Sequence, residues 1–352
     1  MAADETKQTE RRARILRLVS EELPPLIKVP VPSSIREADW FRAAALEEAL
    51  EVYAFPAYQI PLYSGKVFPA LAMLLADEAA GKFRGRPAIA GSSSGNFIKD
   101  MANLSRMFNI GEVYAVVNRS LPEGKVRHIE FAGAKVVYAP EGVPATDYAR
   151  RFATENGCVL EDQYTREDSI EGHRWSMRHI AREMEKAAGS SGFIFGAVTG
   201  TCSTLMAAQK YLKPQFGGRV KIFGVASMSK AEKVPGSRTP EDLRELESIE
   251  GFGAQLYRHP ERFLDFPLIA SVPKREAYRL NAELHHEADL QAGPTSALLE
   301  GGLYGLLRDH AGRGALAELK NDRGRIAAVL FFMDSFLAYT GDDEYRSYFL
   351  NK

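Results

Sequence analysis

Short apolar runs alternate with longer amphipathic stretches along most of this chain. The apolar runs predict strands at 113–117, 135–138, 193–198, 220–225 and 326–332. Apolar residues at helical spacing predict helices at about 67–81, 96–108, 123–132, 145–156, 170–188, 202–212, 275–287 and 295–309. Strands that alternate with helices are typical of parallel sheets covered on both faces. We therefore expect an α/β protein with two three-layer α/β/α lobes and mostly parallel sheets.

The start of the chain follows a different pattern. Residues 1–20 are rich in charged side chains at helical spacing and predict an N-terminal helical arm, whereas the prolines in 23–30 predict an extended segment. We assign residues 45–160 to a smaller N-terminal lobe. Residues 21–44 and 161–352 then form a larger C-terminal lobe.

One junction between a strand and a helix is rich in glycine and serine. Residues 90–97 read A-G-S-S-S-G-N-F between a short apolar strand and an amphipathic helix. Backbone N–H groups at a helix start have no intrahelical partner, and the helix dipole adds partial positive charge. Such a junction binds a carboxylate or a phosphate. The alternative, a flexible Gly/Ser linker, fits poorly because regular elements flank the run directly.

Two further junctions carry hydroxyl groups where ligands bind in open α/β sheets, at the carboxyl ends of strands. Residues 199–204 read T-G-T-C-S-T and suit a phosphate group. No Gly-Lys-Ser/Thr ends this loop, and no G-x-G-x-x-G stands there, so neither a nucleotide P-loop nor a dinucleotide fingerprint is indicated. Residues 293–296 read G-P-T-S before another helix.

Composition narrows the class of partner. The 352 residues carry a formal net charge of −1 with both signs mixed along the chain, so no surface for nucleic acid or an anionic membrane is indicated. Cys158 and Cys202 lack metal-ligand or disulfide-framework spacing. The N-terminus is polar, and the longest apolar run, residues 326–333, is too short to cross a membrane. We therefore expect a cytoplasmic protein without a membrane span. We expect a small-molecule partner and no metal site.

Several motifs occur in an order that resembles one enzyme family. Tyr63-Ser64-Gly65-Lys66 is similar to an S-x-K segment, Ser93-Ser94-Gly95-Asn96 to a T-S-G-N loop, and residues 200–204 to a G-T-G-G-T loop. Matching segments follow at 133–134, 161–164, 249–253, 293–296 and 334–339. Together, from about residue 50 to 340, they resemble the cysteine synthase and tryptophan synthase β family of fold-type II pyridoxal-phosphate enzymes.

The resemblance implies pyridoxal 5'-phosphate as cofactor and Lys66 as the Schiff-base lysine, which later moves the α-proton. A buried lysine at a helix start should have a lowered pKa, because burial and the dipole both disfavour the ammonium form. The alternative is a solvated surface lysine, as most lysines are.

Other roles also follow from the resemblance. Asn96 binds the ring hydroxyl oxygen and Ser296 faces the pyridine nitrogen. The cofactor phosphate is held by Gly200, Thr201, Cys202, Ser203 and Thr204, and the substrate carboxylate site is formed by Ser93, Ser94, Gly95, Phe97 and Gln163. Without the resemblance, Gln163 reads as a surface residue at a strand end.

Some residues depart from the family pattern. Phe97 replaces a threonine of the serine loop, which removes a hydroxyl donor and adds bulk. Cys202 and Ser203 replace two glycines of the phosphate loop, and we expect Cys202 to be a packing residue rather than a nucleophile. Arg119, Lys230 or Arg238 are candidates for meeting an anionic co-substrate, with ordinary surface charge as the alternative.

The resemblance and the neutral Ser296 hydroxyl together imply a reaction type. A hydroxyl does not keep the ring nitrogen protonated, which favours loss of a β-substituent over transamination or racemisation. We expect a homodimeric, cysteine synthase-like transferase of amino-acid biosynthesis. It replaces the β-substituent of O-acetylserine or O-phosphoserine through an α-aminoacrylate that a small nucleophile attacks. The alternatives are a β-eliminating lyase such as a serine or threonine dehydratase, and a non-catalytic relative that binds an amino acid or a partner protein.

Overall fold

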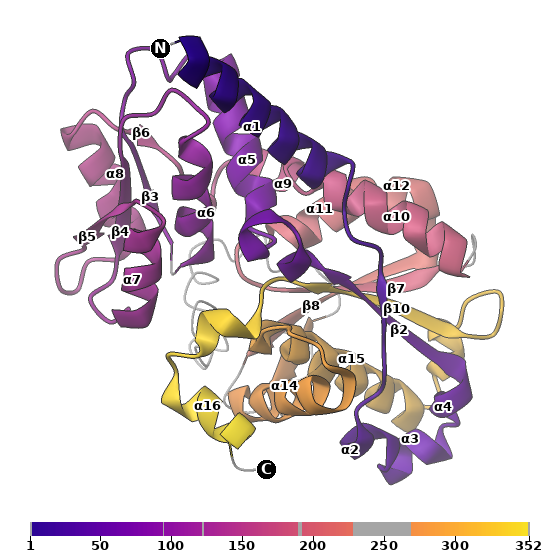
Figure 1. The fold of residues 1–352 in the computed structure, drawn as a ribbon. Helices are drawn as coiled ribbons and strands as arrows, with labels where there is room; N and C mark the ends of the chain where they lie inside the picture. Colours follow the sequence, from indigo (N-terminus) through magenta and orange to yellow (C-terminus); the bar gives the residue numbers. More distant parts are fainter. Residues whose placement is uncertain (1, 94, 122, 189–191, 228–268, 351–352) are drawn as a thin grey trace. The chain divides into compact units, whose positions relative to one another are not determined.

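The computed structural model describes residues 2–93, 95–121, 123–188, 192–227 and 269–350 (Figure 1). The chain forms two compact units. The smaller unit comprises the residues up to Leu23 together with Ile60–Ser176, and the larger unit comprises Pro24–Gln59 and the described residues from Met177 onward. Among the described residues, no helix is both long and apolar enough to cross a membrane.

A four-stranded parallel sheet forms the centre of the smaller unit, in the order β5-β4-β3-β6. Its strands are β3 (Ile89–Ser92), β4 (Val113–Val117), β5 (Lys135–Tyr138) and β6 (Val159–Leu160). The helices of this unit are α1 (Ala2–Ser20), α5 (Val67–Ala79), α6 (Asn96–Ser105), α7 (Glu123–Phe131), α8 (Ala145–Glu155) and α9 (Asp168–Glu171). Figure 1 shows α8 on one face of the sheet and α6 on the other, which gives three layers.

The larger unit is built on a six-stranded sheet in the order β1-β2-β10-β7-β8-β9. Its strands are β1 (Ile27–Val29), β2 (Leu50–Pro56), β7 (Phe193–Val198), β8 (Val220–Ser227), β9 (Ile269–Val272) and β10 (Ile326–Phe332). Only the β1–β2 pair of this sheet is antiparallel among the described strands. Every residue of β10 is buried, as expected for a central strand covered on both faces.

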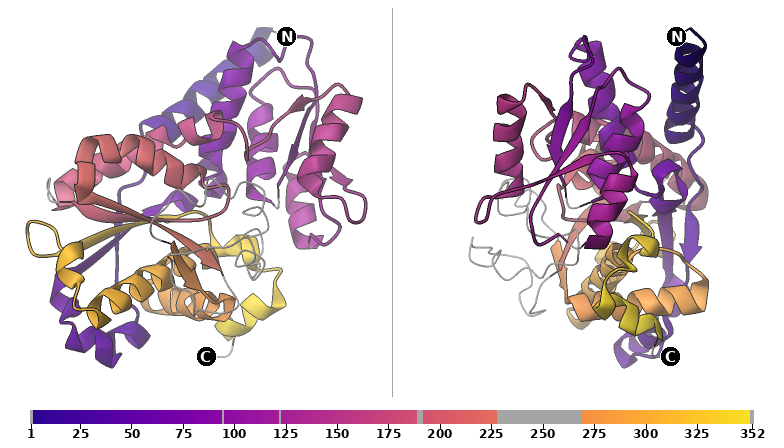
Figure 2. Two further views of the ribbon diagram at one scale, coloured as in Figure 1. Left: turned by 180° about the vertical axis from the view of Figure 1, so that it is seen from behind. Right: turned by 60° about the vertical axis from the view of Figure 1, so that its left-hand side comes forward.

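Helices cover both faces of this second sheet. They are α2 (Ser33–Arg36), α3 (Asp39–Ala43), α4 (Leu46–Ala49), α10 (Arg174–Ala188), α11 (Ser203–Tyr211), α12 (Lys213–Phe216), α14 (Lys274–Ala288), α15 (Pro294–Gly312) and α16 (Asp343–Leu350), with α10 starting at the division between the units. Figure 2 shows α10–α12 and the α14–α15 pair on opposite sides of the strands. The prediction of mostly parallel, three-layer α/β architecture is confirmed.

The predicted helix at 170–188 is interrupted in the structure. α9 ends at Glu171 and α10 begins at Arg174, with Gly172 and His173 between them. A Cβ atom at Gly172 would lie 2.2 Å from the backbone oxygen of Phe68 in α5. The break therefore lies where the backbone packs directly on the first turn of α5, a contact that only glycine permits.

The unit division differs from the predicted lobe boundaries because of long-range pairing. β2, a strand that the sequence pattern does not predict, pairs in parallel with β10, with Leu50 opposite Ile326 and Pro56 opposite Phe332. Residues 50–59 consequently belong to the larger unit. The N-terminal helix α1 belongs to the smaller unit, where Arg12 Nη1 donates a 2.7 Å hydrogen bond to Glu78 Oε1.

Candidate active site

Lys66 is the residue immediately before α5 in the smaller unit. It follows a short 3₁₀ turn, Pro61–Tyr63, in which Leu62 (φ 71°) and Tyr63 (φ 58°) both have left-handed backbone conformations. Such conformations are unfavourable for non-glycine residues and persist only where the surroundings enforce them. The backbone N–H of Lys66 donates to Ser64 Oγ at 3.0 Å, and the lysine side chain is partly exposed. The turn thus holds Lys66 at the start of a buried apolar helix.

Two buried titratable residues lie close to Lys66. Asp100 in α6 is fully buried, and burial raises the pKa of its carboxyl to about 7 against the opposing effect of Lys99. His173, just before α10, is 1% exposed, and burial together with the charge of Lys66 lowers its pKa to about 3. His173 is therefore neutral at physiological pH. Sequence reasoning missed both residues, although Asp100 lies one helical turn after Asn96.

The serine loop connects β3 to α6 as predicted. Ser93 is buried, and its Oγ accepts a hydrogen bond from the backbone N–H of Gly95 at 3.1 Å. Gly95 has φ 156° and ψ −90°, and α6 begins at Asn96. Ser94 lies outside the described residues. Backbone N–H groups in the first turn of a helix suit an anion, and the anion site that the sequence indicates here stays a prediction.

Gln163 lies against this loop. Its Nε2 donates to the backbone oxygen of Ser92 at 3.4 Å, and the side chain is 3% exposed. Within the described residues, Gln163 Oε1 has no hydrogen-bond partner. Gln163 is therefore buried beside the serine loop, and the alternative of a surface strand-end residue is wrong.

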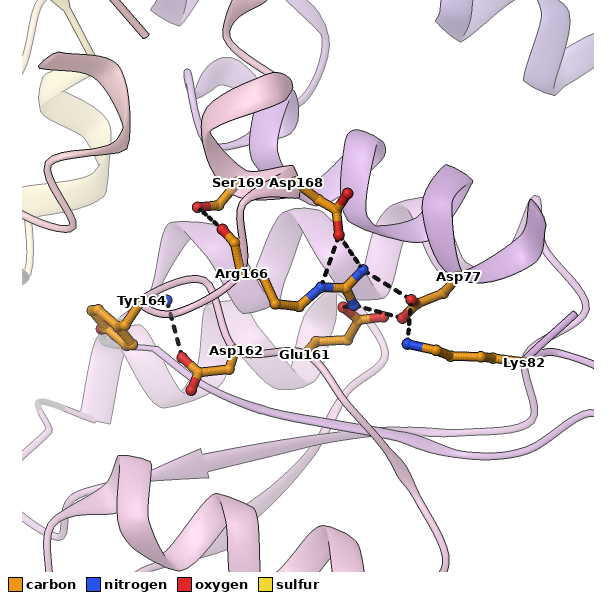
Figure 3. A network of polar contacts seen from close by, with 8 residues as sticks. All are labelled: Asp77, Lys82, Glu161, Asp162, Tyr164, Arg166, Asp168 and Ser169. Carbon is orange, nitrogen blue, oxygen red and sulfur yellow. Dashed lines mark hydrogen bonds and ion pairs between the residues drawn. The ribbon is translucent and has the colours of Figure 1, made fainter. Parts of the chain in front are cut away.

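A network of charged groups fixes the segment that carries Gln163. Figure 3 shows the Arg166 guanidinium between Asp77, Glu161 and Asp168. Its Nη1 lies 2.6 Å from Asp77 Oδ2 and 2.9 Å from Glu161 Oε2, while Nη2 lies 2.6 Å from Asp168 Oδ2. Burial raises the pKa of Glu161, whereas hydrogen bonds from Arg166 and Lys82 outweigh burial and lower the pKa of Asp77. This cluster ties the segment after β6 to α5.

The predicted phosphate loop follows β7 in the larger unit. Thr199 donates to Val225 O through its backbone N–H and through Oγ1, both at 2.9 Å. The hydroxyls of Thr201 and Ser203 lie 3.0 Å apart, and α11 begins at Ser203. Cys202 is buried and has φ 59°, a left-handed conformation that explains why glycine suits this position. A Cβ atom added to Gly200 would meet no atom within 4 Å.

Ser296 lies in the first turn of α15 in the same unit. Its side chain is completely buried, and its hydroxyl has no hydrogen-bond partner within the described residues. The preceding turn is held by Asp334, whose backbone oxygen accepts from Gly293 N at 2.8 Å and whose Oδ1 accepts from Thr295 Oγ1 at 3.1 Å. A buried hydroxyl without a partner is uncommon and fits the expected contact with a cofactor ring nitrogen.

The remaining predicted residues are less informative about the site. Phe97 is 1% exposed and is therefore a packed residue of the first turn of α6, so its contact with substrate stays a prediction. Arg119 lies over the ring of Tyr138 at 5.7 Å. Lys230, Arg238 and the 249–253 segment lie outside the described residues. In the part of the chain that the structure describes, no group of His, Cys, Asp or Glu side chains could hold a metal ion.

Each unit thus brings together one part of the predicted site. In the smaller unit, Lys66 lies near Asp100 and His173, and Ser93 shares its loop with Asn96 beside Gln163. In the larger unit, the 199–204 loop leads from β7 into α11. Ser296 lies on α15, which packs against strands of the same sheet. Within the described residues, the buried Ser296 hydroxyl has no hydrogen-bond partner, which fits a contact with the ring nitrogen of an aromatic cofactor.

Comparisons with known proteins give a family match and several similar folds. Residues 34–317 match the family described as pyridoxal-phosphate dependent enzyme. O-ureido-L-serine synthase has a similar fold, with a TM-score of 0.68 and 18% identity over 92% of each chain. The O-acetylserine dependent cystathionine beta-synthase from Helicobacter pylori has a TM-score of 0.65 and 17% identity, over 92% of this chain and 96% of that one.

A third solved structure extends the likeness. O-acetyl serine sulfhydrylase isoform 3 from Entamoeba histolytica has a TM-score of 0.70 and 15% identity, covering 94% of this chain and 91% of its own. At these identities the likeness shows a shared fold.

Proposed function

Because this chain belongs to the pyridoxal-phosphate dependent enzymes, we propose that it replaces the β-substituent of an activated serine, of the O-acetylserine or O-phosphoserine type. The product is cysteine or a related β-substituted alanine. Support comes from the family match, from the order of motifs, and from the similarity in fold to enzymes named for O-acetylserine and O-ureidoserine chemistry.

The resemblance identifies the residues that would hold the cofactor. In this proposal Lys66 binds it covalently, Asn96 bonds its ring hydroxyl oxygen, the 200–204 loop holds its phosphate, and Ser296 faces its ring nitrogen. When bound, pyridoxal phosphate stabilises the negative charge that develops at the α-carbon of an attached amino acid. The substrate carboxylate would be bound by the serine loop, with Ser93, Ser94, Gly95, Phe97 and Gln163.

The substrate amine would replace the Lys66 amine in the covalent bond to the cofactor, which would free Lys66 to act as the acid–base group. Its Nζ takes the α-proton, and the leaving group departs from Cβ with the electron pair of the Cβ–O bond. A thiol, sulfur anion or amine adds its electron pair to Cβ, and the proton returns to Cα from Lys66. The net change is exchange of the β-substituent for the nucleophile, with the leaving group released as its acid, so no external oxidant or reductant is needed.

The proposed reaction type rests on the neutral hydroxyl of Ser296. A carboxylate at this position would keep the ring nitrogen protonated, whereas a hydroxyl does not impose that charge. Ser296 is completely buried and its hydroxyl is unpartnered within the described residues, so it is available for the ring nitrogen. This favours loss of a β-substituent over transamination.

A substrate panel read by visible absorption tests the proposal. The purified protein with pyridoxal phosphate should absorb in the visible range, and O-acetylserine or O-phosphoserine should shift that band. Lys66→Ala should lose the band and at least about a hundredfold in turnover, because it removes both the cofactor linkage and the acid–base group. Lys28→Ala, whose side chain is 67% exposed in the larger unit, is the control and should behave as the unmodified chain.

Product analysis separates replacement from its alternatives. An amino-acid product that requires a thiol, sulfide or amine supports the proposal. Release of pyruvate or 2-oxobutanoate with ammonia, without an added nucleophile, would instead identify a β-eliminating lyase. A protein that stays colourless with pyridoxal phosphate, or shows no spectral change with any serine derivative, would contradict the proposal.

We also propose that the enzyme is a cytoplasmic homodimer. The support is the resemblance, since enzymes of this kind are commonly homodimers, and the mixed surface charge of the chain. Light scattering should give twice the mass of one chain, and a monomer mass would contradict the proposed assembly.

A further inference from the structure

Asp100 is a fully buried carboxyl on the helix that starts at the serine loop. It lies in α6 four residues after Asn96, so both residues lie on the same face of the helix one turn apart. The first two turns of this helix also carry buried apolar side chains, among them Phe97, Ile98 and Met101. A buried carboxyl in such surroundings is costly unless other polar groups compensate for it. Its neighbours therefore indicate what it does.

The polar groups around Asp100 belong to the turn that presents Lys66. Lys99 Nζ lies 3.4 Å from Asp100 Oδ1 and donates a 3.0 Å hydrogen bond to the backbone oxygen of Leu62. The Ser64 hydroxyl and the Lys66 amine are the other charged or polar groups that act on this carboxyl. Ser64 Oγ also accepts the backbone N–H of Lys66 at 3.0 Å. One cluster thus connects α6 with the left-handed turn at residues 62–63.

The compensation for burial is incomplete. Within the described residues, neither oxygen of Asp100 has a hydrogen bond of ordinary geometry; the groups that act on the carboxyl are Lys99, in the 3.4 Å ion pair, and more weakly Ser64 and Lys66. Burial raises the pKa of Asp100 to about 7, opposed by Lys99, Ser64 and Lys66. Asp100 therefore changes its charge near neutral pH, beside the lysine on which the proposed reaction depends.

We propose that Asp100 is a positioning residue for Lys66: with Lys99 it fixes the turn at residues 62–66, and its charge sets how firmly the Lys66 amine holds a proton. The inference rests on the proposed function, in which Lys66 takes the α-proton. An ionised Asp100 stabilises the ammonium form and makes Lys66 a stronger base. His173, the other titratable neighbour of Lys66, stays neutral and does not compete for this charge.

Competitive labelling of the full chain tests the inference without the cofactor. Reductive methylation followed by peptide mass spectrometry gives the reactivity of Lys66 relative to exposed lysines between pH 6 and 10. In Asp100→Asn, Lys66 should react roughly three- to tenfold faster at pH 8–9, because a nearby opposite charge shifts a pKa by about one or more. At pH 6, where Asp100 is protonated, the two proteins should react alike. Asp100→Glu should restore most of the original profile.

Asp77→Asn is the matched control. Asp77 is also a buried carboxyl of the smaller unit, but its partners are Arg166 and Lys82. This variant should leave the labelling profile of Lys66 unchanged. If Asp100→Asn also leaves the profile unchanged while remaining folded, the inference is overturned and Asp100 is only a packing residue.

A second variant keeps the test valid if Asp100→Asn does not fold. Lys99→Met removes the ion pair with Asp100 and the hydrogen bond to the backbone oxygen of Leu62. Asp100 should then ionise less readily, and the labelling rate of Lys66 at pH 8 should rise towards that of Asp100→Asn. An unchanged profile in folded Lys99→Met would overturn the inference in the same way.

The holoenzyme separates this inference from the proposed function. In Asp100→Asn, kcat should fall roughly three- to tenfold with KM within about twofold, and the pH dependence of kcat near pH 7 should weaken. If the unmodified chain never binds pyridoxal phosphate, the proposed function fails while the labelling result still stands. If it binds and turns over but Asp100→Asn has the same pH profile, only the inference fails.

Discussion

At the scale of single residues, buried polar groups without partners carry most of the new information. Glu300 in α15 is completely buried, and within the described residues neither carboxyl oxygen has a hydrogen-bond partner. Ser296 lies one turn before Glu300 on this helix and Tyr304 one turn after it, and their hydroxyls are also unpartnered. Burial, together with the charge of Glu283, raises the pKa of Glu300 well above its ordinary value. Burial thus favours the neutral form of Glu300.

Glu300→Gln should change the pH dependence of stability. The folded-state pKa is raised, so the stability linked to Glu300 is complete below the unfolded value of about 4.5 and is lost as pH rises towards the folded value. As the pH rises above about 4.5, urea unfolding should therefore show that the unmodified chain loses stability relative to Glu300→Gln, by up to about 1.4 kcal/mol per pH unit. A stability difference between the two proteins that does not change with pH would contradict the raised pKa of Glu300.

At the scale of elements, the predicted site residues depend on segments whose position is fixed by contacts with other helices and strands. The segment after β6 is an example, because Gln163 lies beside the serine loop only while its chain stays fixed near α5. The Arg166 cluster provides that link through Asp77 and Glu161 (Figure 3). Arg166 is 17% exposed, while the two carboxylates are 2% and 0% exposed. These ion pairs are little screened by solvent.

Arg166→Met should destabilise the smaller unit by about 3–5 kcal/mol, because it leaves two buried carboxyl groups without their cation. Lys82→Met is the matched control. Lys82 also contacts Asp77, at 2.7 Å, but its side chain is 49% exposed, so its loss should cost about 1 kcal/mol or less. Urea unfolding followed by circular dichroism measures both values. Equal losses of stability in the two variants would show that burial of the Arg166 cluster does not increase its contribution to stability.

At the scale of the whole molecule, each unit has its own sheet and its own set of predicted site residues. The smaller unit carries Lys66 and the serine loop, and the larger unit carries the 199–204 loop and Ser296. A ligand that binds only the folded state stabilises it in proportion to the logarithm of its excess over the dissociation constant. The cofactor should therefore act on the stability of the chain as well as on its chemistry.

Pyridoxal phosphate at a hundredfold excess over its dissociation constant should stabilise the folded chain by about 2.7 kcal/mol. Scanning calorimetry should show this as a rise in Tm. Pyridoxal, which lacks the phosphate, should give a clearly smaller rise at the same concentration because it cannot use the loop at residues 200–204. Equal shifts with the two compounds would argue against that loop as the phosphate site.

How much of the site the sequence predicts depends on how local its signal is. The helix starts after the serine loop and the phosphate loop are local features, set by glycine, hydroxyl side chains and the apolar spacing that follows, and both lie where predicted. Asp100 and His173 carry no such signal. Each is a polar residue in or beside a predicted helix, and only its burial near Lys66 makes it significant.

The sequence by itself determined the alternation of strands and helices, the parallel three-layer class and the order of motifs, because these depend on periodicity and on short-range turn chemistry. Tertiary structure alone decided the rest. It placed β2 beside β10, broke a helix at Gly172 and buried Gln163 beside Ser92. These outcomes join residues far apart in the chain, and the burial that shifts the pKa of Asp100 exists only once those residues have packed together.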